Sequence, residues 1–120
     1  MVDVLLVDDA AYMRKLIRIM LEKGKHTVIG EARTGAEGVE QYRELKPDLV
    51  IMDITMPDMG GLDALVQIRE YDGDAKVLMC TASAQVAHQE QASIGGAVGY
   101  LVKPINRAEL LAKVEEICNK

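Results

Sequence analysis

The sequence contains no tryptophan, no phenylalanine and only four tyrosines among its 120 residues. Proteins that bind single-stranded nucleic acid stack the bases on aromatic side chains, so this scarcity argues against that function. A hydrophobic core must instead be built from aliphatic residues and methionine. At 49% hydrophobic and 28% charged residues, the composition is that of a folded chain rather than a disordered one.

Cysteine is almost as scarce. Cys80 lies in an apolar run and Cys118 lies near the C-terminus. Their spacing is that of neither a metal site nor a redox pair. We therefore expect two reduced thiols with structural roles.

Basic residues are outnumbered by acidic ones, 14 to 19, which gives a formal net charge of −5. Such a protein repels phosphate backbones, so we expect no nucleic-acid partner. No apolar run is long enough for a signal peptide or a membrane span, because acidic residues interrupt the first run at Asp8. We expect a cytoplasmic protein without a membrane partner, folded as one domain over residues 1–120.

Five short apolar runs predict buried strands, and the stretches between them have helical spacing. The runs cover residues 4–8, 27–30, 48–53, 76–81 and 99–102. Two helix starts are also marked, because Thr34 and Asn106 are each followed three residues later by a glutamate, as in a capping box. The alternation predicts an α/β domain in which five helices cover both faces of a five-stranded, doubly wound parallel sheet.

In such a sheet, ligands bind beyond the carboxyl ends of the strands. The polar residues at these ends are Asp8, Asp9, Asp53, Thr81 and Lys103. Each has an ordinary explanation by itself, and for Asp9 alone we favour the N-cap of the following helix. Together they predict a site, provided that the first and third strands are neighbours.

Three carboxylates so close together require a counter-charge, since two charges 4 Å apart repel by roughly 4 kcal/mol at an effective dielectric of 20. The ligands are all oxygen, which favours Mg²⁺, with Mn²⁺ as the alternative, over zinc. With a lysine and a hydroxyl nearby, the group suits transfer of a phosphoryl group to a carboxylate.

The motifs that contain these residues resemble the signature of the response-regulator receiver domain along the whole chain. They are Val7-Asp8-Asp9, the run from Asp53 to Pro57 with Gly60-Gly61, Thr81-Ala82 and Lys103-Pro104. The sequence is most similar to the stand-alone receivers of chemotaxis. The resemblance implies a flavodoxin-like fold with strand order 2-1-3-4-5, and a cis bond before Pro104.

The resemblance also implies a role for each site residue. Asp53 would accept a phosphoryl group from a histidine kinase. The metal ion would be held by Asp9, Asp53 and the carbonyl group of Thr55, and by Asp8 through water. On this interpretation the protein is not an enzyme but a phospho-acceptor that assists its own phosphorylation and dephosphorylation.

The expected switch consists of Thr81 and Tyr100, which would turn toward the phosphoryl group, while Lys103 would contact it directly. The output surface would be the face of the fourth helix, fifth strand and fifth helix, binding a motility motor or an adaptor protein. A phosphatase is a further candidate partner, and we expect a monomer. Residues 84–96 contain few large apolar side chains and should form the loosest helix.

Five basic residues lie on the first helix and at its exit: Arg14, Lys15, Arg18, Lys23 and Lys25. They have two interpretations. They form either a solvated face supported by an Arg18–Glu22 pair or a docking surface for an acidic phosphodonor domain.

Three alternative functions remain open from the sequence. The first is a phosphorelay intermediate of the sporulation type. The second is a small phosphatase with an aspartate nucleophile, but such enzymes have an acid two residues after the nucleophile, where this chain has Thr55. The third is a flavin or dinucleotide carrier, but acidic residues rather than a glycine-rich loop follow the first strand.

Overall fold

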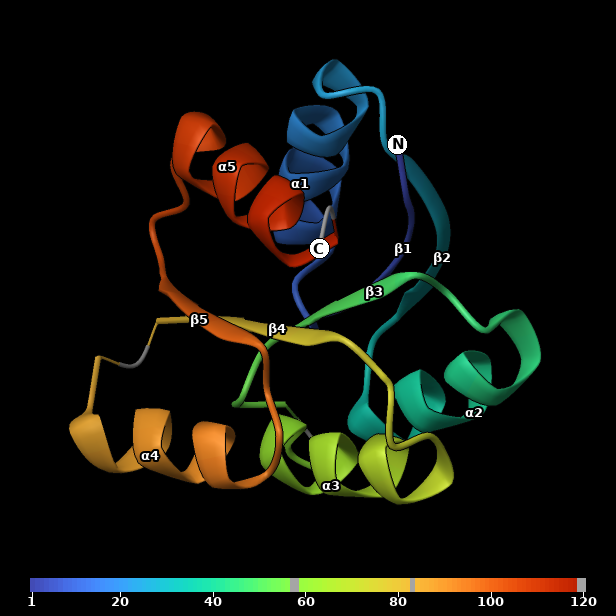
Figure 1. Cartoon of the computed structure of the whole chain (residues 1–120). Helices are drawn as coiled ribbons and strands as arrows, with labels where there is room; N and C mark the ends of the chain where they lie inside the picture. Colours follow the sequence, from blue (N-terminus) through green and yellow to red (C-terminus); the bar gives the residue numbers. More distant parts are fainter. Residues whose placement is uncertain (57–58, 83, 119–120) are drawn as a thin grey trace.

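The computed structural model describes residues 1–56, 59–82 and 84–118. Within these ranges, strands and helices alternate from the N-terminus to the C-terminus (Figure 1). The elements are β1 (Asp3–Val7), α1 (Ala11–Lys23), β2 (Thr27–Ala32), α2 (Gly35–Leu45), β3 (Leu49–Met52), α3 (Gly61–Tyr71), β4 (Val77–Thr81), α4 (Val86–Ile94), β5 (Gly99–Val102) and α5 (Arg107–Cys118). All strand pairs are parallel and their order is β2-β1-β3-β4-β5, which confirms the expected fold class.

Two layers of helices cover the sheet. Figure 1 shows α1 and α5 on one face and α2, α3 and α4 on the other. Successive side chains of a strand point to opposite faces, so Leu5 and Val7 pack on the α2–α4 side whereas Val4 and Leu6 pack on the α1–α5 side. Both layers of the core are built almost wholly from aliphatic residues and methionine.

Among the residues that the structure describes, Tyr42 is the one buried tyrosine. Its hydroxyl group donates a hydrogen bond of 2.8 Å to the Asp72 carboxylate, so the polar end of the ring is satisfied.

Strand ends differ from the sequence predictions by one or two residues. The second strand was expected to end at residue 30, but β2 continues to Ala32 because its pairing with β1 extends from Thr27 to that residue. The acidic residue expected at the end of β1 lies one position beyond the strand, and so does the one at the end of β3. The prediction failed at β2 because polar Glu31 interrupts its apolar pattern.

Both capping predictions are confirmed. The hydroxyl oxygen of Thr34 accepts a hydrogen bond of 3.1 Å from the backbone N–H of Glu37. The side-chain oxygen of Asn106 accepts one of 3.0 Å from the backbone N–H of Glu109. These bonds satisfy backbone donors at the starts of α2 and α5 that have no partner within the helix.

The interpretation of Asp9 as an N-cap is wrong. Helix α1 is preceded by Ala10, which makes no side-chain cap. The carbonyl oxygen of Ala10 instead accepts the backbone N–H groups of Met13 and Arg14. The helix therefore begins one residue later than expected, and the exposed Asp9 remains in the turn after β1.

Helix α4 has the fewest buried residues, since Ala92 is the single buried one, as the small side chains of this segment led us to expect. Val86 is 68% exposed and Ile94 is 86% exposed. Cys80 and Cys118 are both free thiols, as expected. No helix within the described ranges has the length and apolar character needed to cross a membrane.

Candidate metal and phosphoryl site

The centre of the sheet brings two acidic residues together. Val7 and Met52 pair at the ends of β1 and β3, so the residues that follow them are adjacent. The backbone N–H of Asp53 donates to the carbonyl oxygen of Val7 at 3.0 Å. The backbone N–H of Asp8 donates to the carbonyl oxygen of Ala32 at 3.0 Å, which ties the same edge to β2.

Asp8, Asp9 and Asp53 form a cluster in which one carboxylate oxygen of each lies within 4.8 Å of the others. Asp8 and Asp53 are buried, at 4% and 8% exposed, whereas Asp9 faces solvent. An all-oxygen set that is open on one side fits a hard divalent cation that keeps some of its water. The donor set therefore fits Mg²⁺, as the sequence predicted.

Lys103 supplies the positive charge in this cluster. Its Nζ atom lies 2.7 Å from Oδ2 of Asp8 and 3.3 Å from Oδ2 of Asp53. Burial would lower the pKa of Lys103, but the hydrogen bond to Asp8 and the nearby carboxylate charges outweigh burial and raise it. The ammonium group is therefore held charged against the carboxylates.

The segment after β5 places this lysine at the site. Its backbone N–H donates to the carbonyl oxygen of Thr81 at 2.8 Å, and the Lys103–Pro104 bond is cis, as expected. The polar ends of β4 and β5 thus meet beside the carboxylates.

The loop after β3 is shaped by a close backbone approach. A Cβ atom on Gly61 would collide with the backbone carbonyl oxygen of Asp53, and the N–H of this glycine donates to the carbonyl oxygen of Ile54 at 2.7 Å. Thr55 is exposed, and its N–H donates to Oδ1 of Asp53 at 3.4 Å. Pro57, the end of the sequence motif, lies outside the described residues.

Thr81 and Tyr100 lie on the same face of the sheet. Tyr100 pairs with Met79, and both belong to the core layer under α3 and α4. Thr81 is two residues beyond Met79 and therefore points to the same side. Thr81 is buried, at 1% exposed, and the tyrosine is half-buried.

A hollow of about 240 Å³ lies beside the tyrosine, between α4 and β5. Its lining residues are Gln89, Ala92, Ser93, Ala97, Val98, Gly99 and Tyr100.

Sequence reasoning missed one part of the site. Arg14 donates through Nε to Oε1 of Glu31 at 2.9 Å and through Nη1 to the carbonyl oxygen of Asp8 at 2.5 Å. Arg18 donates through Nη2 to the second oxygen of Glu31 at 2.6 Å. The expected Arg18–Glu22 pair is present, but at the longer distance of 3.7 Å.

These contacts change the interpretation of the basic helix face. The hydrogen bond from Arg18, together with the bond and charge of Arg14, lowers the pKa of Glu31 despite some burial. Two of the five basic residues of this region are therefore engaged with β2. Spacing along α1 indicated that both arginines share one face, but nothing local indicated a partner on a strand.

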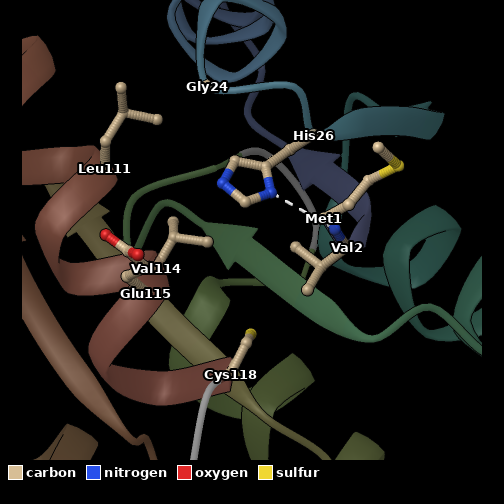
Figure 2. A pocket seen from close by; sticks show the side chains of 8 residues that line it. All are labelled: Met1, Val2, Gly24, His26, Leu111, Val114, Glu115 and Cys118. Carbon is tan, nitrogen blue, oxygen red and sulfur yellow. Dashed lines mark hydrogen bonds between the residues drawn. The ribbon is translucent and has the colours of Figure 1, made fainter.

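A second cavity has a volume of about 240 Å³, and Figure 2 shows the side chains that line it. Its lining residues are Met1, Val2, Gly24, His26, Leu111, Val114, Glu115 and Cys118. The Nδ1 atom of His26 accepts a hydrogen bond of 3.2 Å from the N–H of Val2. The three clustered carboxylates lie at the other ends of the strands, so this cavity is separate from the candidate site.

Residues 4–115 match the family model for the response regulator receiver domain. The chain belongs to the receiver-domain family. The receiver is 43% identical to the chemotaxis protein CheY of Thermotoga maritima over 114 residues, which are 95% of each chain. It is 42% identical to CheY of Bacillus subtilis over 116 residues, which are 97% of each chain.

Solved structures show the same fold. The structure of a CheX–CheY–BeF₃–Mg²⁺ complex from Borrelia burgdorferi matches the receiver with a TM-score of 0.93 and 33% sequence identity. The match covers 96% of this chain and 87% of that one. The receiver is thus a two-component response regulator of the CheY type.

Proposed function

We propose that the receiver accepts a phosphoryl group on Asp53 from the phosphohistidine of a histidine kinase, with Mg²⁺ as cofactor. The observation that carries the proposal is the convergence of Asp8, Asp9, Asp53 and Lys103 at one sheet edge. Asp53 is suited to be the acceptor because its carboxylate lies within reach of Lys103 at 3.3 Å and it directly follows β3, at the start of the loop that leads to α3.

In the proposed transfer, a carboxylate oxygen of Asp53 forms a bond to phosphorus while the phosphorus–nitrogen bond of the donor breaks. The electron pair of that bond returns to the imidazole of the kinase. Lys103 stabilises the added negative charge from its place 3.3 Å from Oδ2 of Asp53, and the Thr81 hydroxyl donates to a phosphoryl oxygen.

The metal ion would be held by Asp9, Asp53 and the carbonyl oxygen of Thr55, and by Asp8 through water. When bound, Mg²⁺ supplies positive charge that offsets the carboxylates and the phosphoryl oxygens. Without this ion, the ammonium group of Lys103 pairs directly with Asp8 and Asp53.

The signal would leave through the face formed by α4, β5 and α5. Thr81 and Tyr100 share one side of the sheet, so a hydroxyl group drawn toward the phosphoryl group makes room for the tyrosine to turn inward. Exposed apolar side chains on α4 and the hollow beside Tyr100 give the α4–β5 part of this face little charge to desolvate.

The proposed output is a chemotaxis signal to a motility motor or to an adaptor protein. The identity to CheY proteins over almost their whole length supports this output and a single receiver domain over residues 1–120. We further propose a cytoplasmic monomer whose phosphoryl group is removed by its own slow hydrolysis or by a phosphatase.

Intact-mass measurement tests the acceptor. Incubated with Mg²⁺ and a small acyl phosphate, the receiver should gain the mass of one phosphoryl group. Asp53→Asn should gain none, whereas Asp63→Asn, which changes an exposed residue of α3, should react like the parent. Undiminished uptake by Asp53→Asn would refute the assignment.

A further inference from the structure

Arg14 is a nearly buried arginine that no part of the proposed chemistry uses. Its side chain is 11% exposed, although α1 faces solvent along much of its length. The guanidinium group bonds to Glu31 on β2 and to the backbone carbonyl oxygen of Asp8. Arg18, one turn later, occupies the other oxygen of Glu31.

The carbonyl oxygen of Asp8 belongs to the peptide unit that joins Asp8 to Asp9. Both carboxylates are therefore carried by the group that Arg14 holds. The same turn is fixed at two further points, because Oδ1 of Asp8 accepts the N–H of Ala10 at 2.9 Å and the N–H of Asp8 bonds to Ala32.

These hydrogen bonds connect the turn after β1 to β2 by two separate routes. Glu31 and Ala32 are consecutive on β2, so the strand holds the turn once directly through Ala32 and once through Glu31 and Arg14. A planar guanidinium group can serve both acceptors at fixed angles, which an ammonium group cannot do as well.

We propose that Arg14, oriented by Glu31 and Arg18, is a positioning residue that fixes the Asp8–Asp9 peptide and so sets the receiver's affinity for Mg²⁺. The inference rests on the proposed function in so far as it takes this cluster to bind the ion. It adds a residue that contacts neither the ion nor the phosphoryl group.

The sign of the change in Mg²⁺ affinity distinguishes a positioning role of Arg14 from a purely electrostatic one. Removing a positive charge near a cation site should by itself tighten cation binding. Loosening the peptide that carries two ligands should weaken it. Outer contacts that orient metal ligands typically change metal affinity by about 10–100-fold, so positioning should prevail in Arg14→Gln.

The experiment measures the Mg²⁺ dissociation constant of the full chain by calorimetric titration. We expect about tenfold weaker binding for Arg14→Gln and weaker binding also for Arg14→Lys, which keeps the charge. Arg33→Gln is the control, because it removes an equal charge from an exposed ion pair with Glu37 and should bind like the parent. Urea unfolding of each variant in EDTA confirms that it is folded.

A second readout does not depend on metal. Hydrogen exchange of the Ala10 amide, followed by NMR in EDTA, should accelerate in Arg14→Lys and in Glu31→Gln, because the turn loses a restraint. The Arg33→Gln control should leave this amide unchanged. Glu31→Gln also keeps the proposal testable if Arg14→Gln does not fold.

The outcomes are distinguishable. A parent chain that binds Mg²⁺, together with folded Arg14 variants that bind it as tightly or more tightly, would overturn the positioning role and leave the proposed function intact. A parent chain that binds no Mg²⁺ would overturn both.

Discussion

Lys103→Met is the substitution with the clearest expected energetic consequence. It keeps the length and apolar stem of the side chain but removes the ammonium group that lies 2.7 Å from Oδ2 of Asp8 and 3.3 Å from Oδ2 of Asp53. At an effective dielectric of 20, these two attractions are about 6 and 5 kcal/mol before the cost of burying the charge. Most of that gross energy is offset by desolvation.

The net loss should be about 3 kcal/mol of unfolding free energy in metal-free buffer. Breaking a buried ion pair costs about 3–5 kcal/mol because it leaves a charge uncompensated. The lower end applies here because the lysine side chain is 14% exposed. Mg²⁺ should then restore more stability to the variant than to the parent, since no ammonium group competes for the carboxylates.

Urea unfolding followed by circular dichroism measures both effects, because the chain has no tryptophan for fluorescence. Mg²⁺ at a hundred times the dissociation constant of the parent should stabilise the parent by about 2.7 kcal/mol, and the same concentration should stabilise the variant by more. Lys113→Met is the control, because this lysine has a 3.7 Å pair on the surface of α5 and should change stability by less than about 1 kcal/mol. A Lys103→Met variant as stable as the parent in EDTA would refute the reasoning.

Three further substitutions test other parts of the structure. Gly61→Ala should destabilise the receiver by about 1–3 kcal/mol in urea unfolding, because the new methyl group displaces the backbone of Asp53. An unchanged free energy of unfolding would show that the loop accommodates the methyl group without cost. Thr34→Ala should cost about 1 kcal/mol in the same assay through loss of the α2 cap, and a change below the error would contradict this. Burial and the charged N-terminus lower the pKa of His26 from 6.5. The neutral ring, which accepts the N–H of Val2, therefore stabilises the folded state above pH 6.5. This stabilisation is lost as the pH falls through the lowered pKa. The free energy of unfolding of His26→Gln should therefore fall less between pH 7 and pH 5 than that of the parent. An equal fall in both proteins would refute the role of His26 in this pH dependence.

Much of the fold could be predicted because its signals are local. Continuous apolar runs and helical stripes indicated each element, and the oxygen atoms of Thr34 and Asn106 cap their helices as their spacing indicated. The strand order came from the family resemblance, since apolar runs carry no information on which strands are neighbours. The end of β2 was missed because Glu31 is polar, although backbone pairing continues past it.

The parts of the candidate site that depend on local sequence signals could be predicted, and the parts that depend on contacts distant in the sequence could not. Residues at strand ends share one sheet edge in any parallel sheet, so Asp8, Asp53 and Lys103 could be grouped before their distances were known. The cap of α1 was misassigned because Asp9 satisfies the residue preference while the turn after β1 needs one more residue. Arg14 was missed because one of its partners, Glu31, lies 17 residues away in the sequence. The other partner is the backbone carbonyl group of Asp8, which no residue type reveals.

Locating the phosphoryl group on the chain tests most directly whether Asp53 is the acceptor. Borohydride reduces an aspartyl phosphate to homoserine, so the treated receiver can be digested and the altered residue read by peptide mass spectrometry. Homoserine is expected at position 53, dependent on Mg²⁺ and on the acyl phosphate. Homoserine at position 8 or 9, or at no position in a phosphorylated sample, would contradict this assignment.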